Sequence, residues 1–289
     1  MGAFVWMIGA LFSFCVMAVA ARELSADIST AQTLFVRSVI GIIIVSSLIF
    51  RKGDLSLFRT KRIGLHVGRG LCHFVGQYGW FVSIGLLPLA QVFALEFTTP
   101  LWTLIIASIF LKESPTLKKA AAIVLGFGGV YLILDPGRDI IDPASLIMIV
   151  AAIFFSLTFV CSKALSRTEH PLTVLFFMCL IQAPIGLALG LKSFVVPNSM
   201  QCAWLLLVGV TSLTGHFCIS SAMAKADASV VVTLDFLRLP LITAVGVIGY
   251  QEPFKPMLVV GAGLMLIGNL INIYPNRAAS LLKPQRQEN

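Results

Sequence analysis

Five charged side chains lie within long apolar stretches of the chain: Arg37, Arg69, Glu96, Asp235 and Arg238. A charge at the centre of a bilayer costs at least about 2.5–3.5 kcal/mol, so such side chains pair with one another or face a wet cavity. Counted from the ends of their apolar runs at the helical rise per residue, Arg37 and Glu96 lie at the same depth below one membrane face. Arg69 and Asp235 lie at the same depth below the other face. We therefore expect two ion pairs, Arg37 with Glu96 and Arg69 with Asp235.

Arg238 offers an alternative pairing, because it follows Asp235 by one helical turn on the same face. An intrahelical pair between these two residues would leave Arg69 in need of another partner. Three arginines against two acids also leave one cation spare, which could hold the carboxylate or phosphate of a substrate. The plainer alternative is that Arg69 snorkels to the membrane surface and the other charges form structural pairs.

Two sets of polar side chains recur at helical spacing and predict which faces look inward. The first set is Arg69, His73, Gln77 and Trp80, and the second is Ser212, His216 and Ser220. Facing a common cavity, they would supply donors and an aromatic wall for a small polar organic molecule. Each histidine taken alone is better explained as a hydrogen-bonded packing residue, with a role as a proton relay as the alternative.

The sequence contains no nucleotide-binding loop, His-Glu-x-x-His motif or nucleophile elbow. Neither ATP hydrolysis nor common hydrolytic chemistry is indicated, so we expect no enzyme activity, no cofactor and no metal site.

The elements that position these residues are predicted membrane helices. Hydrophobic residues make up 58% of the 289 residues and charged residues only 12%, about half the charged fraction of a soluble domain. Apolar runs near twenty residues are long enough to cross a bilayer as helices. We expect an all-α membrane protein with ten spans, at residues 3–20, 30–50, 63–85, 90–111, 117–135, 143–162, 172–191, 201–222, 228–250 and 255–274.

Basic residues in the connections predict the orientation. The net charge of +8 arises from Lys and Arg in short loops rather than on one basic face, which argues against a nucleic-acid partner. Residues 51–62 carry the densest basic cluster and are expected in the cytoplasm. With ten spans, both termini then lie in the cytoplasm of a bacterium, and the chain sits in its inner membrane.

The chain also contains an imperfect repeat. His73–Pro115 and His216–Pro253 both begin with His-Phe, place an acidic residue before Phe, and end with Glu before a proline, directly or one residue later. We expect two five-helix repeats of inverted orientation, at residues 1–137 and 138–275, followed by a cytoplasmic tail at 276–289. Pro100 and Pro240 are expected to bend the fourth and ninth spans.

Glycines predict close contacts between helices. They occur as Gly64-x-x-x-Gly68, as Gly186-x-x-x-Gly190, and in two dense groups at residues 126–129 and 261–263.

This pattern resembles the EamA-type branch of the drug/metabolite transporter superfamily over essentially the whole chain. The resemblance rests on the two halves, on the arginine in LFVRSVIG, and on Arg69-Gly70, Pro100, Glu113 and Glu252. It implies a secondary carrier of small metabolites, with a central cavity between inverted repeats and alternating access. The Arg69-Gly70 pair and the segment LDFLRLP are similar to members that take up S-adenosylmethionine or export amino acids.

We therefore expect a secondary transporter for a zwitterionic or carboxylate-bearing metabolite, with a proton or an exchanged solute as its second partner. It would work as a monomer or a homodimer within the lipid bilayer. The alternative is a membrane protein without transport activity, either a lipid-embedded enzyme or a structural subunit.

Overall fold

The computed structural model describes residues 2–110, 116–134, 142–165, 168–223, 225–226, 231 and 234–273. The expected tail at 276–289 lies outside them. The helices are α1 (Gly2–Leu24), α2 (Thr30–Lys52), α3 (Ile63–Leu86), α4 (Leu89–Glu96), α5 (Thr99–Phe110), α6 (Leu117–Leu134), α7 (Pro143–Leu165), α8 (Pro171–Gly190), α9 (Ser199–Met223), α11 (Arg238–Tyr250) and α12 (Pro256–Ile273), with 3-10 turns at Leu55–Phe58 and Leu191–Ser193.

The all-helical membrane fold is confirmed. In the described part of the chain, seven helical segments are long and apolar enough to cross a bilayer, and one of these runs through both α4 and α5. α3 has 24 residues but is not among the seven, because it carries the polar side chains noted above. α11 and α12 are shorter apolar helices. The count of ten spans remains a prediction.

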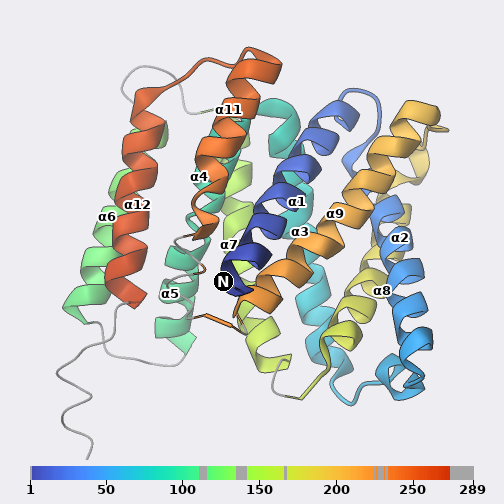
Figure 1. The fold of residues 1–289 in the computed structure, drawn as a ribbon. Helices are drawn as coiled ribbons and strands as arrows, with labels where there is room; N and C mark the ends of the chain where they lie inside the picture. Colours follow the sequence, from blue (N-terminus) through green and yellow to red (C-terminus); the bar gives the residue numbers. More distant parts are fainter. Residues whose placement is uncertain are drawn as a thin grey trace, which may run out of the picture.

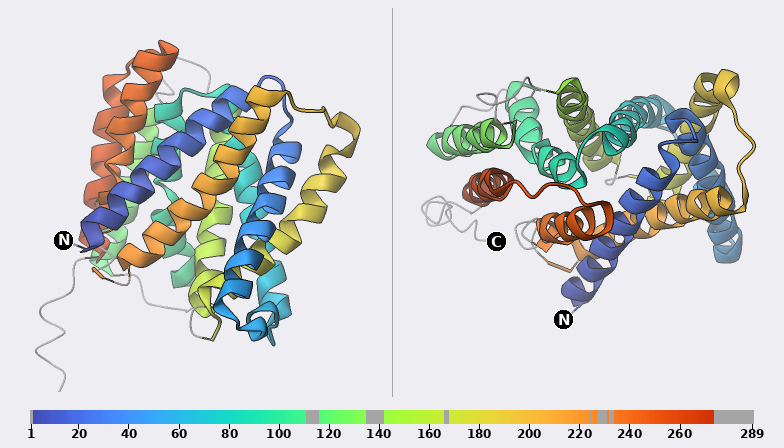
Figure 2. Two further views of the ribbon diagram at one scale, coloured as in Figure 1. Left: turned by 45° about the vertical axis from the view of Figure 1, so that its right-hand side comes forward. Right: turned by 90° about the horizontal axis from the view of Figure 1, so that it is seen from above.

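Helices from the two parts of the chain pack against one another. α1 lies along α9, α3 along α7, α2 along α8, and α6 along α12. The α2 and α8 pair forms one end of the bundle, the α6 and α12 pair forms the other, and α4 and α11 lie between α6/α12 and α1 (Figures 1 and 2). Each pair joins a helix before residue 137 to one after it, so the two parts of the chain pack together in one bundle.

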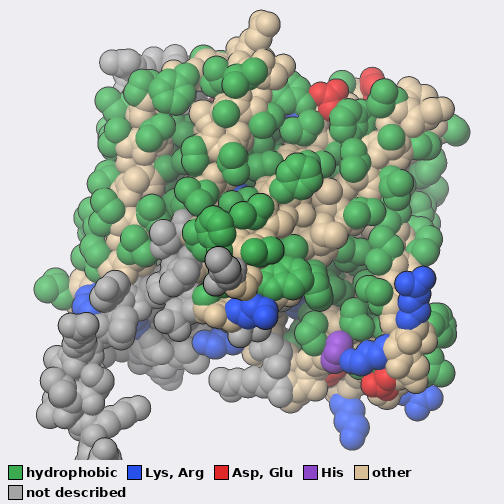
Figure 3. All heavy atoms as spheres, viewed as in Figure 1, with side chains coloured by type: hydrophobic (Ala, Val, Ile, Leu, Met, Phe, Trp, Pro, Cys, Tyr) green, Lys and Arg blue, Asp and Glu red, His purple; other side chains and the backbone are tan. Residues whose placement is uncertain are grey.

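The surface agrees with a membrane location. Large hydrophobic side chains are exposed, including Phe12 at 69% and Ile248 at 82%. Figure 3 shows hydrophobic side chains over most of the face in view and Lys and Arg side chains gathered along its lower edge. This is the edge at which α2 ends and α3 begins (Figure 1). The charge distribution therefore distinguishes a basic face from the opposite one.

Polar contacts hold the connection between α2 and α3 against the end of α7 and the residues just before α8. Thr60 Oγ1 donates to Glu169 Oε1 at 2.8 Å, and Arg62 Nη1 donates to the Ala164 carbonyl at 2.9 Å. His170 caps α8 by accepting the Leu172 N–H. Partial burial, and then the charge of Lys52, lower the pKa of His170, so its ring is neutral at pH 7. A neutral ring retains the lone pair that the cap requires.

The two bent spans are broken helices. α4 ends at Glu96 and α5 begins at Thr99, while a turn at residues 236–237 separates Asp235 from α11. Pro100 is the second residue of α5 and Pro240 the third of α11. Proline is tolerated in a first helical turn because no intrahelical partner is lost there. The expectation that these prolines bend continuous helices is therefore wrong in detail, since each stands at the start of a new helix.

Glycine packing follows the sequence at some positions only. A Cβ atom on Gly129 of α6 would collide with the Gly261 carbonyl of α12, and one on Gly261 would meet the Gly129 carbonyl at 2.5 Å. A Cβ atom on Gly186 would lie 2.9 Å from the backbone nitrogen of Phe35, which is also too close. Gly64 and Gly68, in contrast, have no atom within 4 Å of the added Cβ, so the contact predicted from their spacing is wrong.

The contact between α6 and α12 can be tested by adding one methyl group. We expect Gly129→Ala to destabilise the protein by about 1–3 kcal/mol, because a backbone carbonyl cannot move aside as a flexible side chain can. Thermal unfolding in detergent measures the loss. Gly128→Ala is the matched control, because its added Cβ meets nothing within 4 Å. Equal effects of the two substitutions would contradict this packing.

Candidate functional site

Arg238 lies at the centre of the first charged cluster and contacts two carboxylates. Its Nη2 donates to Asp235 Oδ2 at 2.6 Å, and its Nη1 contacts Glu96 Oε1 at 3.4 Å. Glu96 Oε2 also accepts the Trp80 indole N–H at 2.8 Å. Glu96 is the last residue of α4 and Arg238 the first of α11. The two helix breaks therefore bring these charges together.

Aromatic rings enclose this cluster. The Arg238 guanidinium carbon lies 5.0 Å from the ring centre of Phe14, 5.5 Å from that of Phe93 and 5.3 Å from that of Phe97. Phe97 stacks on Phe236 with ring centres 4.1 Å apart. Each of these two phenylalanines directly follows an acidic residue of the cluster. The acid-Phe pair that occurs twice in the sequence therefore marks the two phenylalanines that stack where the two helix breaks meet.

A second cluster surrounds Arg37 and contains only uncharged partners. Nη1 of this buried side chain donates to Ser212 Oγ at 2.7 Å, and its Nη2 donates to Gln182 Oε1 at 2.8 Å. Gln182 Nε2 in turn lies 2.8 Å from His73 Nδ1. Nε of Arg37 is buried and has no hydrogen-bond partner among the described residues. Nearer the basic face, Arg69 Nε donates to Ser162 Oγ at 2.7 Å.

Ring contacts connect the two clusters. His73 and His216 lie 5.8 Å apart between ring centres, and His216 meets the edge of Phe14 at 5.5 Å. Phe14 also faces Arg238. A continuous row of side chains therefore runs from Arg37 to Arg238, across helices α2, α8, α3, α9, α1 and α11.

Both ion pairs predicted from depth are wrong. Arg37 contacts neutral groups instead of Glu96, and Asp235 contacts Arg238 instead of Arg69. Counting residues from the span ends assumed straight helices across the membrane, whereas α4 ends at its acid and the helices are tilted (Figure 1). The alternative pair of Asp235 with Arg238 is confirmed, and the partner that Arg69 then needed is Ser162.

Two further residues of the predicted inward face of α3 lie in different surroundings. Trp80 joins the Arg238 cluster, while the Oε1 atom of the buried Gln77 has no hydrogen-bond partner among the described residues. The side chain of Ser220 lies outside the described residues. Sequence reasoning missed Ser162, Phe14 and Phe93, because nothing in one sequence shows which helix faces which.

The two clusters differ in their capacity for charge. Two carboxylates share one guanidinium around Arg238, which leaves room for one further positive charge. The Arg37 cluster contains a buried cation with no carboxylate, so it is able to receive an anionic group. In the described residues, no group of three His, Cys, Asp or Glu side chains could hold a metal ion.

A third charged group lies on the face opposite the basic one. Arg22 Nη2 donates to Glu252 Oε1 at 2.9 Å and to the Leu87 carbonyl at 2.5 Å, and Glu252 Oε2 accepts the Leu89 N–H at 2.9 Å. Gln251 has a left-handed backbone with φ of 55°, which lets the chain turn back after α11. We call Arg22, Glu252 and the residue 87–89 backbone the latch, because they join the end of α1, the α3–α4 connection and the α11–α12 connection.

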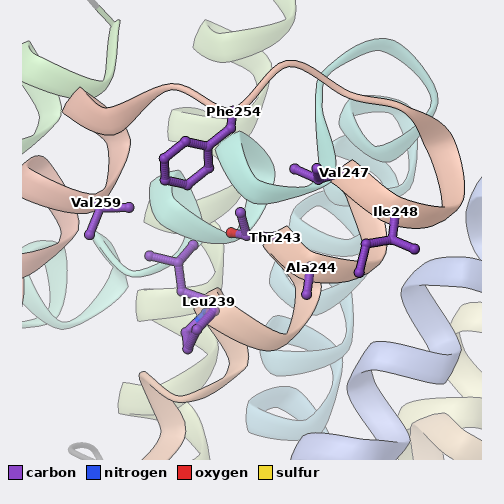
Figure 4. A pocket seen from close by; sticks show the side chains of 8 residues that line it. Leu239, Thr243, Ala244, Val247, Ile248, Phe254 and Val259 are labelled. Carbon is purple, nitrogen blue, oxygen red and sulfur yellow. The ribbon is translucent and has the colours of Figure 1, made fainter.

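An apolar groove of about 470 Å³ lies between α11 and α12. Figure 4 shows Leu239, Thr243 and Val247 of α11 opposite Phe254 and Val259. Its lining is apolar apart from Thr243 and includes no residue that hydrogen-bonds in the two clusters. The groove is therefore separate from the charged row, although Leu239 directly follows Arg238.

The chain is similar in sequence to a known protein family and to several named bacterial proteins. The sequence profile of the EamA-like transporter family matches residues 1–135 and 142–274. A protein named riboflavin transporter from Vibrio cholerae is 30% identical, over 91% of this chain and 89% of its own. An S-adenosylmethionine uptake transporter from Rickettsia felis is 24% identical over 98% and 96%. The pseudopaline exporter CntI from Pseudomonas aeruginosa is 23% identical over 89% and 91%.

Solved structures were compared as well. One crystal structure aligns with 93% of this chain and 95% of its own, with a TM-score of 0.66 and 18% identity. At this identity the likeness shows a shared fold alone.

Replacement of Arg238 should lower the stability of the folded protein. We expect Arg238→Gln to destabilise the protein by about 3–5 kcal/mol, because the Asp235 carboxylate is left buried without a cation. Adding Asp235→Asn should restore part of this loss, which thermal unfolding of both single variants and the double variant would measure. Arg59→Gln, in the exposed connection between α2 and α3, is the control with little effect. Strictly additive losses would show that the two residues are not coupled.

Proposed function

The chain belongs to the EamA-like transporter family, and we propose that it is a secondary active transporter of a small zwitterionic metabolite. Transport of a small metabolite across the membrane is what its relatives are named for, and none of those named above is an enzyme. These relatives are bacterial, and the chain is a multi-pass inner-membrane protein. The observation that carries the zwitterionic class is the pair of linked clusters with opposite capacity for charge.

Each end of such a solute has a matching cluster. A carboxylate would be bound by Arg37, whose buried Nε has no partner, with Arg69 adding positive charge from α3. An amine or sulfonium group would be bound by Glu96 and Asp235 and by the rings around Arg238, since aromatic faces attract cations. S-adenosylmethionine and amino acids carry both kinds of group, and relatives named for S-adenosylmethionine uptake support this class.

We infer alternating access as the mechanism. The cross-packed helix pairs and the two family matches, at 1–135 and 142–274, support inverted repeats that move against each other. The basic face would be cytoplasmic, with both chain termini on that side, and the latch would close the outer face. Solute would then enter or leave from outside only after Glu252 separates from Arg22 and from the Leu89 N–H.

A second solute class has its own support. The relative from Vibrio cholerae is named for riboflavin, which has a flat, uncharged ring system. Trp80, Phe14 and the stacked Phe97 and Phe236 supply aromatic faces for such a ring. Binding of riboflavin would not require a free buried cation, so the two classes respond differently to loss of Arg37.

The solute class can be tested by ligand-induced thermal stabilisation of the purified protein. A ligand at 100 times its dissociation constant stabilises by about 2.7 kcal/mol. With S-adenosylmethionine and amino acids, we expect Arg37→Gln to weaken binding at least about tenfold, because charge-assisted hydrogen bonds are lost. Binding of the corresponding amino acid amides, which lack the carboxylate, should be weakened little by the same substitution. Arg62→Gln is the control, and riboflavin binding that survives in Arg37→Gln would favour the second class.

Opening of the latch can be followed through Cys15 of α1, which is half-buried next to the Arg238 cluster. In liposomes, Glu252→Gln should raise the rate at which an impermeant thiol reagent modifies Cys15 several-fold. A partly exposed ion pair with added backbone hydrogen bonds stabilises the closed face by about 1 kcal/mol. Cys202→Ser removes the exposed cysteine as background, and Asp27→Asn is the charge control. An unchanged rate would remove the latch from the gating step.

A further inference from the structure

We propose that Glu96 is a proton-binding site and that it holds a proton at neutral pH in the arrangement described. The proposal deepens the function proposed above, on which it rests for its role in transport. It follows from the number of charges around Arg238 and from the unequal contacts that the two acids make. The ligand is the proton itself.

The cluster contains more negative than positive charge. Glu96 and Asp235 share one guanidinium, and both of their side chains are largely buried, at 19% and 18% exposure. Two carboxylates that share a single cation in a low-dielectric site do not both ionise readily, because each disfavours the charge of the other. One proton would balance the cluster.

The contacts assign that proton to Glu96 rather than to Asp235. The contact between Arg238 and Asp235 is 2.6 Å long, which is typical of a charge-assisted hydrogen bond, whereas the contact with Glu96 is 3.4 Å long. The second partner of Glu96 is the neutral Trp80 indole. Glu96 is also the last residue of α4, where the helix dipole disfavours a negative charge.

Among the described residues, the other groups that face the cluster do not supply a second permanent cation. Cys15 on α1 interacts electrostatically with Arg238 and Asp235, and a thiol adds no positive charge. His216 on α9 contacts Phe14, whose ring also faces Arg238. α3 contributes Trp80, and Arg238 itself begins α11. In the transport cycle, a cationic solute group that reaches Glu96 would take the place of the proton.

Infrared spectroscopy of the purified full-length protein tests the assignment directly. Exposed carboxyl groups ionise near pH 4, so a protonated carboxyl band that persists at pH 7 belongs to a protected group. We expect such a band in the wild type and its loss in Glu96→Gln. In Asp235→Asn, Glu96 no longer shares the Arg238 guanidinium with a second carboxylate. Glu96 should then ionise more readily, so the band should disappear at a lower pH than in the wild type.

Glu23→Gln is the matched control, because Glu23 is an exposed carboxylate outside the Arg238 cluster, where it accepts the Tyr250 hydroxyl. The band should be unchanged in this variant. Absence of the band from the wild type would overturn the proposal, as would its persistence in Glu96→Gln. The wild-type titration needs no variant to fold. It also needs no solute, so a negative result would leave the zwitterionic class standing, and failure of the solute panel would leave the proton site standing.

Discussion

The ion pairs of Arg238 are the constraint on which the rest of the structure depends. The guanidinium of Arg238 is buried in an apolar bundle, and the carboxylates of Glu96 and Asp235 reach it because each stands directly before a turn between helical segments. Broken helices in a membrane leave backbone carbonyls that must be satisfied within the protein. The hydroxyls of Thr98 and Thr99 donate to the Leu95 and Glu96 carbonyls at 2.7 and 2.6 Å. The break and the charge cluster thus depend on each other.

The same constraint joins the two parts of the chain. Glu96 comes from the first part and Arg238 from the second, and the stack of Phe97 on Phe236 repeats this connection through aromatic rings. The carbonyl-to-glycine contacts of α6 with α12 hold one end of the bundle in the same way. Motion of one part of the chain against the other would therefore rearrange the contacts around Arg238, while the glycine contacts allow α6 and α12 to remain close.

The sequence predicted most of the long helices, because an apolar run of about twenty residues favours a helix that crosses the bilayer. It also predicted most polar residues of the site, since a polar side chain in an apolar run needs a partner. Their partners were not predictable in the same way. Arg37 contacts Gln182 and Ser212 through helix pairs that link distant parts of the chain, and residue counting along one helix carries no information about these pairs. Gly64 and Gly68 show the same limit, since their spacing fits a contact that the fold does not make.

The polar character of α3 has a consequence for biogenesis. Arg69 finds its hydroxyl partner 93 residues later in the chain, and His73 finds its amide partner 109 residues later. When α3 leaves the ribosome, neither α7 nor α8 has been made, so these polar side chains of α3 lack their partners. We therefore expect α3 to be held less firmly in the membrane in a product truncated before α7.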